Sequence, residues 1–239
     1  YFISNTRGQL ALQRQTYIGA NIQGGFERVY ANEFDLPHGG FAGNTSERGA
    51  KFTAIQSFIE STPNKQWYVF AFMDYTWGIM EYDFGAGPDF PRVSQAYVDY
   101  RTQCSNNPAL CVGNPPAIQV PGLDPGPGDQ LTIESTIRYQ PTTAFQTQLN
   151  YTKRRLVRHD TGLVAFDDNL FSSRSVYQFT RDIFARLRVD YSTLNRRIRP
   201  QLVVGWTPSP GTAFYLGYND DVNNNGYNPY LHPPLQESG

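Results

Sequence analysis

The sequence has few cysteines, methionines and histidines, and it has no long hydrophobic run. Its 239 residues include 2 Cys, 2 Met and 3 His. A run of about 18 apolar residues, the minimum for a transmembrane helix, does not occur. Charge of one sign is also lacking, because 20 Lys+Arg oppose 21 Asp+Glu. The basic excess of a nucleic-acid binder is therefore absent, and we predict no nucleic-acid partner.

Aromatic residues, in contrast, are abundant, with 16 Tyr, 16 Phe and 3 Trp. This content excludes a disordered chain. The mean hydropathy of -0.50 is still compatible with a transmembrane β-barrel, whose strands alternate apolar and polar residues. The chain opens at Tyr1 without an apolar leader, so we expect that a signal peptide has been removed or lies upstream.

Period-two alternation dominates the chain, and hardly any window shows the 3.6-residue period of a helix. Leu131, Ile133 and Ile137 share one face of such a segment, while Glu134 and Arg138 occupy the other. This pattern predicts an all-β chain. The alternating segments are 2–13, 16–31, 49–61, 66–83, 129–140, 143–158, 169–179, 182–193, 197–207 and 212–219.

The connections between these segments alternate in length. Short turns are expected at 62–65, 140–143, 179–182 and 207–211, and longer loops at 32–48, 84–128 and 159–168, with a tighter one at 194–197. Outer-membrane barrels show this asymmetry between periplasmic turns and external loops. The sequence therefore predicts an antiparallel up-and-down outer-membrane β-barrel that occupies 1–239 as a single region, with a long external loop at 84–128 and a C-terminal loop at 219–239.

The alternation also predicts which side chains contact lipid. Aromatic residues near segment ends, such as Trp67 and Trp77, are typical of the interface between lipid and water. The apolar face is expected to point outward through Leu131, Ile133, Ile137, Leu187, Val189, Leu202, Val204 and Trp206. The lumen then receives Glu134, Arg138, Arg186 and Arg188. Together with Arg154, Arg174 and Asp190, these are expected to form a charge ladder across the lumen, which braces the barrel or tunes a pore.

Several longer runs resemble one known family. The runs are Asp83 to Ser94, Leu123 to Asp129, Tyr151 to Lys153, Val164 to Asn169, Tyr177 to Arg181 and Gly205 to Tyr215. They are similar to the C-terminal half of a bacterial outer-membrane family of unknown function, whose members carry a carbohydrate-binding family 9-like β-sandwich ahead of a membrane barrel. The resemblance covers most of 50–230 and implies a barrel in the bacterial outer membrane.

Two departures limit what the resemblance implies. Nothing in the chain resembles the N-terminal sugar-binding sandwich, so no carbohydrate-binding role is carried onto any residue. The family also closes with one more aromatic-ended strand, whereas this chain stops at Gly239. We therefore expect an ordered fragment of a longer barrel, and no catalytic residue is transferred to it.

The sequence carries no enzyme motif. His38, His159 and His232 fall in expected loops without metal-ligand spacing, and no phosphate-binding or nucleophile motif occurs. A carboxylate pair at Asp167 and Asp168 lies next to an expected strand start, where one of the two is expected to cap a turn rather than to act in glycoside hydrolysis. We predict a non-enzymatic protein.

A second carboxylate pair, at Asp220 and Asp221, opens an Asn-rich run. Asp221, Asn223 and Asn225 place oxygen ligands at positions 1, 3 and 5, with Gly at position 6, as calcium loops do. His232 stands where an EF-hand has a bidentate Glu, so a full EF-hand is excluded. The interpretation stays open between a weak external site, with calcium as the cofactor, and a surface loop without a metal.

Cys104 and Cys111 lie in the longest expected loop, which is rich in Asn, Pro and Gly. Oxidising compartments use such a pair to tie down a loop that has no core of its own. Reduced thiols or half of a metal site are the alternatives, but the pair has no nearby His to complete a zinc site. We predict a disulfide.

Two functions from different classes remain open. The first is a non-enzymatic outer-membrane barrel in transport, surface binding or envelope assembly, whose partners are membrane lipid and other envelope proteins or a remainder of the same chain. The second is a soluble or surface-attached β-rich carbohydrate-binding protein whose aromatic residues stack on sugars. Detergent dependence separates them, because a barrel leaves the membrane fraction only with detergent.

Overall fold

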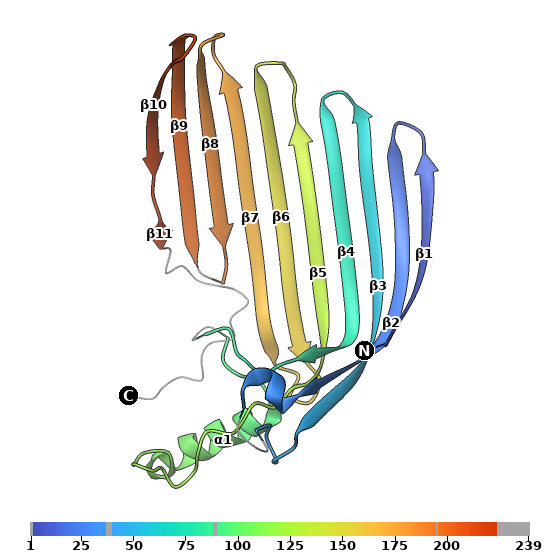
Figure 1. Ribbon diagram of the computed structural model, residues 1–239, viewed down its shortest axis with the longest axis vertical. Helices are drawn as coiled ribbons and strands as arrows, with labels where there is room; N and C mark the ends of the chain where they lie inside the picture. Colours follow the sequence, from blue (N-terminus) through green and yellow to red (C-terminus); the bar gives the residue numbers. More distant parts are fainter. Residues whose placement is uncertain (1, 37–39, 88–89, 195, 224–239) are drawn as a thin grey trace.

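The computed structural model describes residues 2–36, 40–87, 90–194 and 196–223. They form one antiparallel sheet in which β1 to β10 follow one another in sequence order, and β11 pairs with β9 (Figure 1). The predicted all-β meander is confirmed. The strands are β1 (Phe2–Leu12), β2 (Thr16–Tyr30), β3 (Glu47–Asn64), β4 (Trp67–Glu81), β5 (Gly126–Tyr139), β6 (Phe145–Arg158), β7 (Val164–Gln178), β8 (Ile183–Ser192), β9 (Arg197–Ser209), β10 (Thr212–Asn219) and β11 (Val222–Asn223).

The connections divide the sheet into a turn end and a loop end. Tight hairpins join the strands at the turn end, whereas the longer connections lie together at the opposite end (Figure 1). The loop end also carries η1 (Ala31–Phe34), α1 (Gln95–Asn106) and η2 (Pro108–Leu110). The predicted alternation of loop lengths is confirmed for the connections 31–46 and 82–125. It is wrong for the later strands, because the β6–β7 and β8–β9 connections, 159–163 and 193–196, are as short as the β5–β6 turn at 140–144.

Helix α1 corrects the prediction of a loop without helices at 84–128. Ser94 caps the helix, since its hydroxyl oxygen accepts a hydrogen bond from the Tyr97 N–H at 3.3 Å. No residue of α1 is buried. A helix that packs no face against a core needs no apolar stripe, and without that stripe the sequence does not show the 3.6-residue period of a helix. Within the described ranges, no helix is both long and apolar enough to span a bilayer.

Strand β7 begins earlier than the sequence predicts. The expected loop at 159–168 is wrong at its second half, because Phe166, Asp167 and Asp168 already pair with β6. Asp167 and Asp168 stand opposite Arg155 and Arg154 in that ladder. Opposite charges on facing positions stabilise a sheet, which explains why a polar segment extends the strand.

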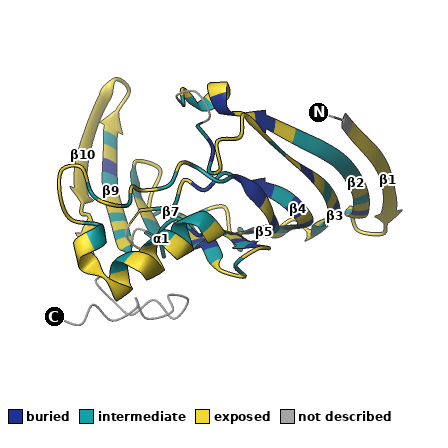
Figure 2. Cartoon of the chain, turned by 90° about the horizontal axis from the view of Figure 1, so that it is seen from below, coloured by how far each residue is buried: buried dark blue, intermediate teal, exposed yellow. Residues whose placement is uncertain are grey.

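The sheet is curved and open. Seen from the loop end, its strands follow an arc with β1 and β10 at the two ends (Figure 2), and β1 and β10 are not paired with each other. The structure thus shows the up-and-down sheet that was predicted, but not the closure that makes a barrel.

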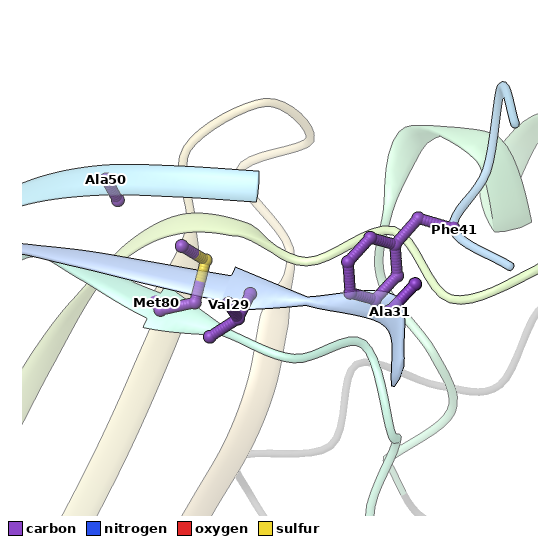
Figure 3. Close-up of a cluster of buried hydrophobic side chains, with 5 residues drawn as sticks. All are labelled: Val29, Ala31, Phe41, Ala50 and Met80. Atoms are coloured by element: carbon purple, nitrogen blue, oxygen red, sulfur yellow. The ribbon is translucent and has the colours of Figure 1, made fainter. Parts of the chain in front are cut away.

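A small apolar core lies at the loop end. Val29, Ala31, Phe41, Ala50 and Met80 are buried together (Figure 3). Partly buried neighbours pack around them, namely Phe34, Leu36, Tyr82 and Leu123. Since these residues come from strand ends and from the first two long loops, the core fastens those loops to the sheet.

A bulge at Gly78 directs β4 into this region. Gly78 has φ +74, and a Cβ there would lie 2.2 Å from the Lys51 carbonyl oxygen. Pairing between β3 and β4 ends at Trp77, and the register with β5 shifts between Trp77 and Ile79. Only glycine both adopts this positive φ angle without strain and leaves room for the Lys51 carbonyl oxygen.

We expect Gly78→Ala to destabilise the fold, because the left-handed dihedral alone costs about 1–3 kcal/mol for a residue with a Cβ. Gly8→Ala is the matched control, since a Cβ at Gly8 meets nothing within 4 Å. Urea unfolding in detergent micelles measures both variants. Equal midpoints for the two would contradict the role of the bulge.

Candidate functional site

The cross-strand register gives the sheet two chemically different faces. One row of paired positions runs from Leu10 through Ile18, Ile59, Ala71, Ser135, Tyr151 and Phe171 to Tyr191. The face that contains this row is named the apolar face, and the opposite one the polar face. Exposed side chains of the apolar face include Leu10, Ile18, Ile22, Ile55, Ile59, Met73, Ile137, Leu149, Leu187 and Leu202.

The predicted side-chain orientation is confirmed as far as the faces go. Leu187 stands opposite Leu202, and Ile137 stands opposite Leu149, so all the residues expected to face outward share the apolar face. Glu134, Arg138, Arg186 and Arg188 alternate with them and lie on the polar face.

Burial on these faces is inverted relative to a soluble sheet. Ile22 is 57% exposed and Leu149 48% exposed, whereas Thr76 and Thr132 on the polar face are 6% and 9% exposed. An antiparallel sheet in water normally buries its apolar face and exposes its polar one. The sheet therefore presents its apolar side chains to the surroundings.

The polar face is the more enclosed of the two. Ala54, Thr76 and Thr132 lie on it and are 3%, 6% and 9% exposed. Because side chains converge on the inner side of a curved sheet, we assign the polar face to the inner surface of the arc in Figure 2.

Aromatic side chains mark the limits of the apolar face. At the turn end Trp67 stacks on Tyr139 with ring centroids 4.2 Å apart, and Trp206 stacks on Phe214. Toward the loop end of β4 lie Tyr75 and Trp77, whereas Tyr151, Phe171 and Tyr191 stand in the row of Ala71, between Trp67 and Trp77. Between Trp67 and Trp77, β4 rises by about 33 Å, which corresponds to a height of about 25 Å at the strand tilt of membrane barrels.

The polar face carries a hydrogen-bond network within the sheet. The Asn21 amide donates to Gln56 Oε1 at 2.8 Å, and the Gln56 amide donates to Asp74 Oδ2 at 2.6 Å. Ion pairs of the predicted ladder also stay within the sheet, with Arg188 2.7 Å from Asp190 and Arg154 3.9 Å from Glu134. The ion pairs found for the described residues of the predicted ladder thus join neighbouring strand positions and do not cross from one wall of the sheet to another.

A buried polar cluster holds the longest loop at the loop end. The Arg158 side chain is 2% exposed, lies 2.6 Å from Glu81 and 2.8 Å from Asp160, and donates to the Asp124 carbonyl. Arg48 completes this side of the cluster with an ion pair to Asp124 at 3.1 Å. These contacts join strand ends that are far apart in the sequence.

Asp83 is the second centre of the cluster and is fully buried. Its carboxylate accepts from Arg92 Nε at 2.9 Å and from the Ser94 hydroxyl at 2.8 Å. The Asp124 N–H also donates to it at 3.2 Å. The two ends of the 82–125 connection are thereby tied together. Every one of these charged groups already has partners, so the cluster stabilises the loop and offers no open group for substrate chemistry.

The sequence did not reveal this cluster. Asp83, Arg92 and Asp124 stand within the family-like runs, but nothing in their spacing shows that they meet, and Glu81 lies 77 positions from Arg158. Charged residues next to strand ends were the sole signal of the cluster in the sequence.

No family model and no curated protein matches the chain.

The structure separates the first predicted carboxylate pair. Asp167 lies 2.8 Å from Lys153 on the apolar face beyond Tyr151, whereas Asp168 accepts hydrogen bonds from Ser192 and the Leu194 N–H. Adjacent strand residues point to opposite faces, so the two carboxylates do not act as a pair.

His159 lies 2.7 Å from Asp129, while His38 and His232 lie outside the described residues.

The calcium site stays a prediction. Asp221 lies 3.3 Å from Arg199 and 3.6 Å from Arg197. The backbone of Asn223 belongs to β11, and Asn225 lies outside the described residues. In the described part of the chain, no group of three or more His, Cys, Asp or Glu side chains is placed to hold a metal.

The predicted disulfide is supported. Cys104 and Cys111 lie at disulfide distance with their Cα atoms 5.6 Å apart, and they join the end of α1 to the residue after η2. Reduction should loosen the loop around α1 without unfolding the sheet, because the bond closes a loop of only a few residues. Trypsin cleavage after Arg101 should therefore accelerate on reduction while the β-sheet circular dichroism persists. Two free thiols in native protein would contradict the prediction.

Removal of Arg158 should destabilise the loop end strongly. Arg158→Met leaves Glu81 buried without its cation, which costs about 3–5 kcal/mol. Arg28→Met, which breaks an exposed pair with Glu47, is the control and should cost far less, because exposed ion pairs contribute little to stability. Urea unfolding at pH 8 compares the two variants. Equal losses would show that the buried pair does not hold the loop end.

The same variant should respond to pH. Burial raises the pKa of Glu81, which lies beyond Trp77 and outside the apolar face, and the Arg158 guanidinium opposes this rise. Without Arg158 the folded-state pKa rises further above that of the unfolded chain. Stability then falls as pH increases through this interval, which starts at about 4.3. The deficit of Arg158→Met should thus be smaller at pH 5 than at pH 8, and a deficit that is independent of pH would contradict it.

Proposed function

We propose that this chain is a membrane-embedded part of a non-enzymatic bacterial outer-membrane β-barrel, which acts in transport, surface binding or envelope assembly. One observation carries the proposal: the sheet exposes its apolar face and crowds its polar side chains on the concave face. Hydrocarbon is the surrounding in which this inversion lowers the free energy, because apolar side chains then avoid water while polar groups stay on the lumen side.

The limits of the apolar face support the same proposal. Its aromatic borders match the height of about 25 Å that the apolar band of outer-membrane barrels spans. Tyr and Trp favour these borders because the ring lies in the apolar layer and the polar atom reaches water.

The edges of the sheet imply further strand pairing. Among the strands that the structure describes, β1 and β10 each pair on one side only, and unpaired backbone groups are costly in a bilayer. In the membrane, we propose, both edges are paired, either with each other or with strands from a remainder of the same chain or another envelope protein. Membrane lipid is the other proposed partner.

The proposal is tested by two leucines of equal exposure. Leu187 on the apolar face is 44% exposed and Leu170 on the polar face is 45% exposed. An Arg at the lipid-facing position should cost about 2–4 kcal/mol of folding free energy, whereas the lumen position should tolerate it. Leu187→Arg should therefore reduce assembly into the membrane fraction, and Leu170→Arg should not.

Fractionation with carbonate wash and detergent extraction measures this difference. The wild-type chain should leave the membrane only with detergent. Wild-type protein that stays in the aqueous phase, or two arginine variants that behave alike, would contradict the proposal. Aqueous behaviour combined with retention on a sugar matrix would favour the carbohydrate-binding alternative.

A further inference from the structure

The polar face is divided into two parts of different charge. Strands β1 to β4 contribute to it the cations Arg7 and Arg48 and the carboxylates Glu27, Glu60, Asp74 and Glu81. Strands β5 to β9 contribute far more cations than anions. The arginines there are Arg138, Arg154, Arg158, Arg174, Arg186, Arg188, Arg197 and Arg199, against the carboxylates Glu134, Asp168 and Asp190.

The register aligns part of this charge in one row, which we name the arginine row. Arg138 stands opposite Gln148, which stands opposite Arg174, and this is followed by Arg188 and Gln201. Neighbouring strands lie about 4.8 Å apart. Five adjacent strands thus present guanidinium or amide N–H donors along a single line that contains no carboxylate.

Internal partners neutralise only part of this region, because Arg154, Arg188, Arg197 and Arg199 form ion pairs. Arg138 lies over the Tyr68 ring at 5.5 Å and Arg186 over the Phe184 ring at 4.8 Å, contacts that orient the cation without removing its charge. Among the described residues, Arg138, Arg174 and Arg186 form no ion pair with a carboxylate. Arg188 has one carboxylate partner, Asp190, which also accepts from Ser172 at 2.6 Å.

The facing pair of Arg174 and Arg188 points to a ligand. Like charges on directly opposite strand positions destabilise a sheet, and the two side chains are exposed on the concave face. A bracing ladder would alternate cations and carboxylates across the strands, which this row does not do. An anion held between guanidinium groups would relieve the repulsion through charge-assisted hydrogen bonds.

We propose that the arginine row binds anionic solutes, molecules that carry phosphate, sulfate, sulfonate or carboxylate groups, on the concave face of the sheet. The row lies on the side of the sheet opposite the apolar face, and it crosses β5 at Arg138, between Ile137 and Tyr139. The inference rests on the proposed function and deepens it, because it gives the lumen of the barrel a solute class.

The test uses pyrene-1,3,6,8-tetrasulfonate as the probe and the folded full chain in a neutral detergent, which removes anionic lipid as a source of binding. Fluorescence anisotropy measures the affinity. The wild type should bind the probe, and Arg174→Gln/Arg188→Gln should bind it about tenfold or more weakly, since two charges next to the anion are lost. Arg14→Gln/Arg181→Gln removes the same charge from turns and should leave binding unchanged.

Two further readouts separate ligand binding from structural bracing. Arg174→Lys/Arg188→Lys should retain most of the binding, because the charge is kept. Urea unfolding of Arg174→Gln should give a stability equal to or above that of wild type, since a repulsion is removed. Loss of stability would show that Arg174 braces the sheet, and it would overturn the inference, as would absent probe binding or equal loss in the turn variant.

Failure of this inference differs from failure of the proposed function. A chain that enters membranes but does not bind the probe would support the proposed barrel and contradict the anion site. A chain that stays in the aqueous phase and binds the probe through the arginine row would support the anion site and contradict the membrane assignment.

Discussion

The strand register is the constraint on which the rest of the structure depends. It places Leu187 against Leu202 and Arg188 against Gln201, so each face keeps its chemistry from one strand to the next. A slip of one residue would exchange the faces and move arginines among leucines. Ile22 stands against Ile55 and Ile137 against Leu149 in the same way, so apolar side chains lie next to one another across strands, with polar residues such as Ser57 and Ser173 between some of them. Exposed apolar patches of this kind mark contacts with a partner or a membrane.

The loop end follows a different principle, because it has a core. Beyond the bulge at Gly78, β4 leaves β3 and delivers Met80 to the apolar core and Glu81 to Arg158. Each buried charge there pairs with groups of opposite charge or with hydrogen-bond partners, which come from four separate segments. These contacts hold the long polar loop in place, although the loop contains few apolar residues. The molecule thus combines a sheet whose faces require two different surroundings with a compact cap at one end.

Much of the sheet could be predicted from the sequence, because period-two patterns such as Leu131 to Tyr139 are local. Helix α1 could not, since a capped helix without buried residues leaves no periodic signal. Asp167 and Asp168 looked like loop residues because their basic partners stand on another strand. The pairing of Asp83 with Arg92 and of Glu81 with Arg158 depends on tertiary contacts that spacing does not encode. Closure of the sheet was predicted and is not seen.

The central claim is that the apolar face contacts lipid hydrocarbon, and the three tryptophans test it most directly. Trp67, Trp77 and Trp206 lie on that face. The chain should be reconstituted into vesicles whose acyl chains carry bromine, a quencher of indole fluorescence. We expect strong quenching relative to unbrominated vesicles and weak quenching by aqueous iodide. Quenching by iodide without an effect of the brominated lipid would contradict the claim.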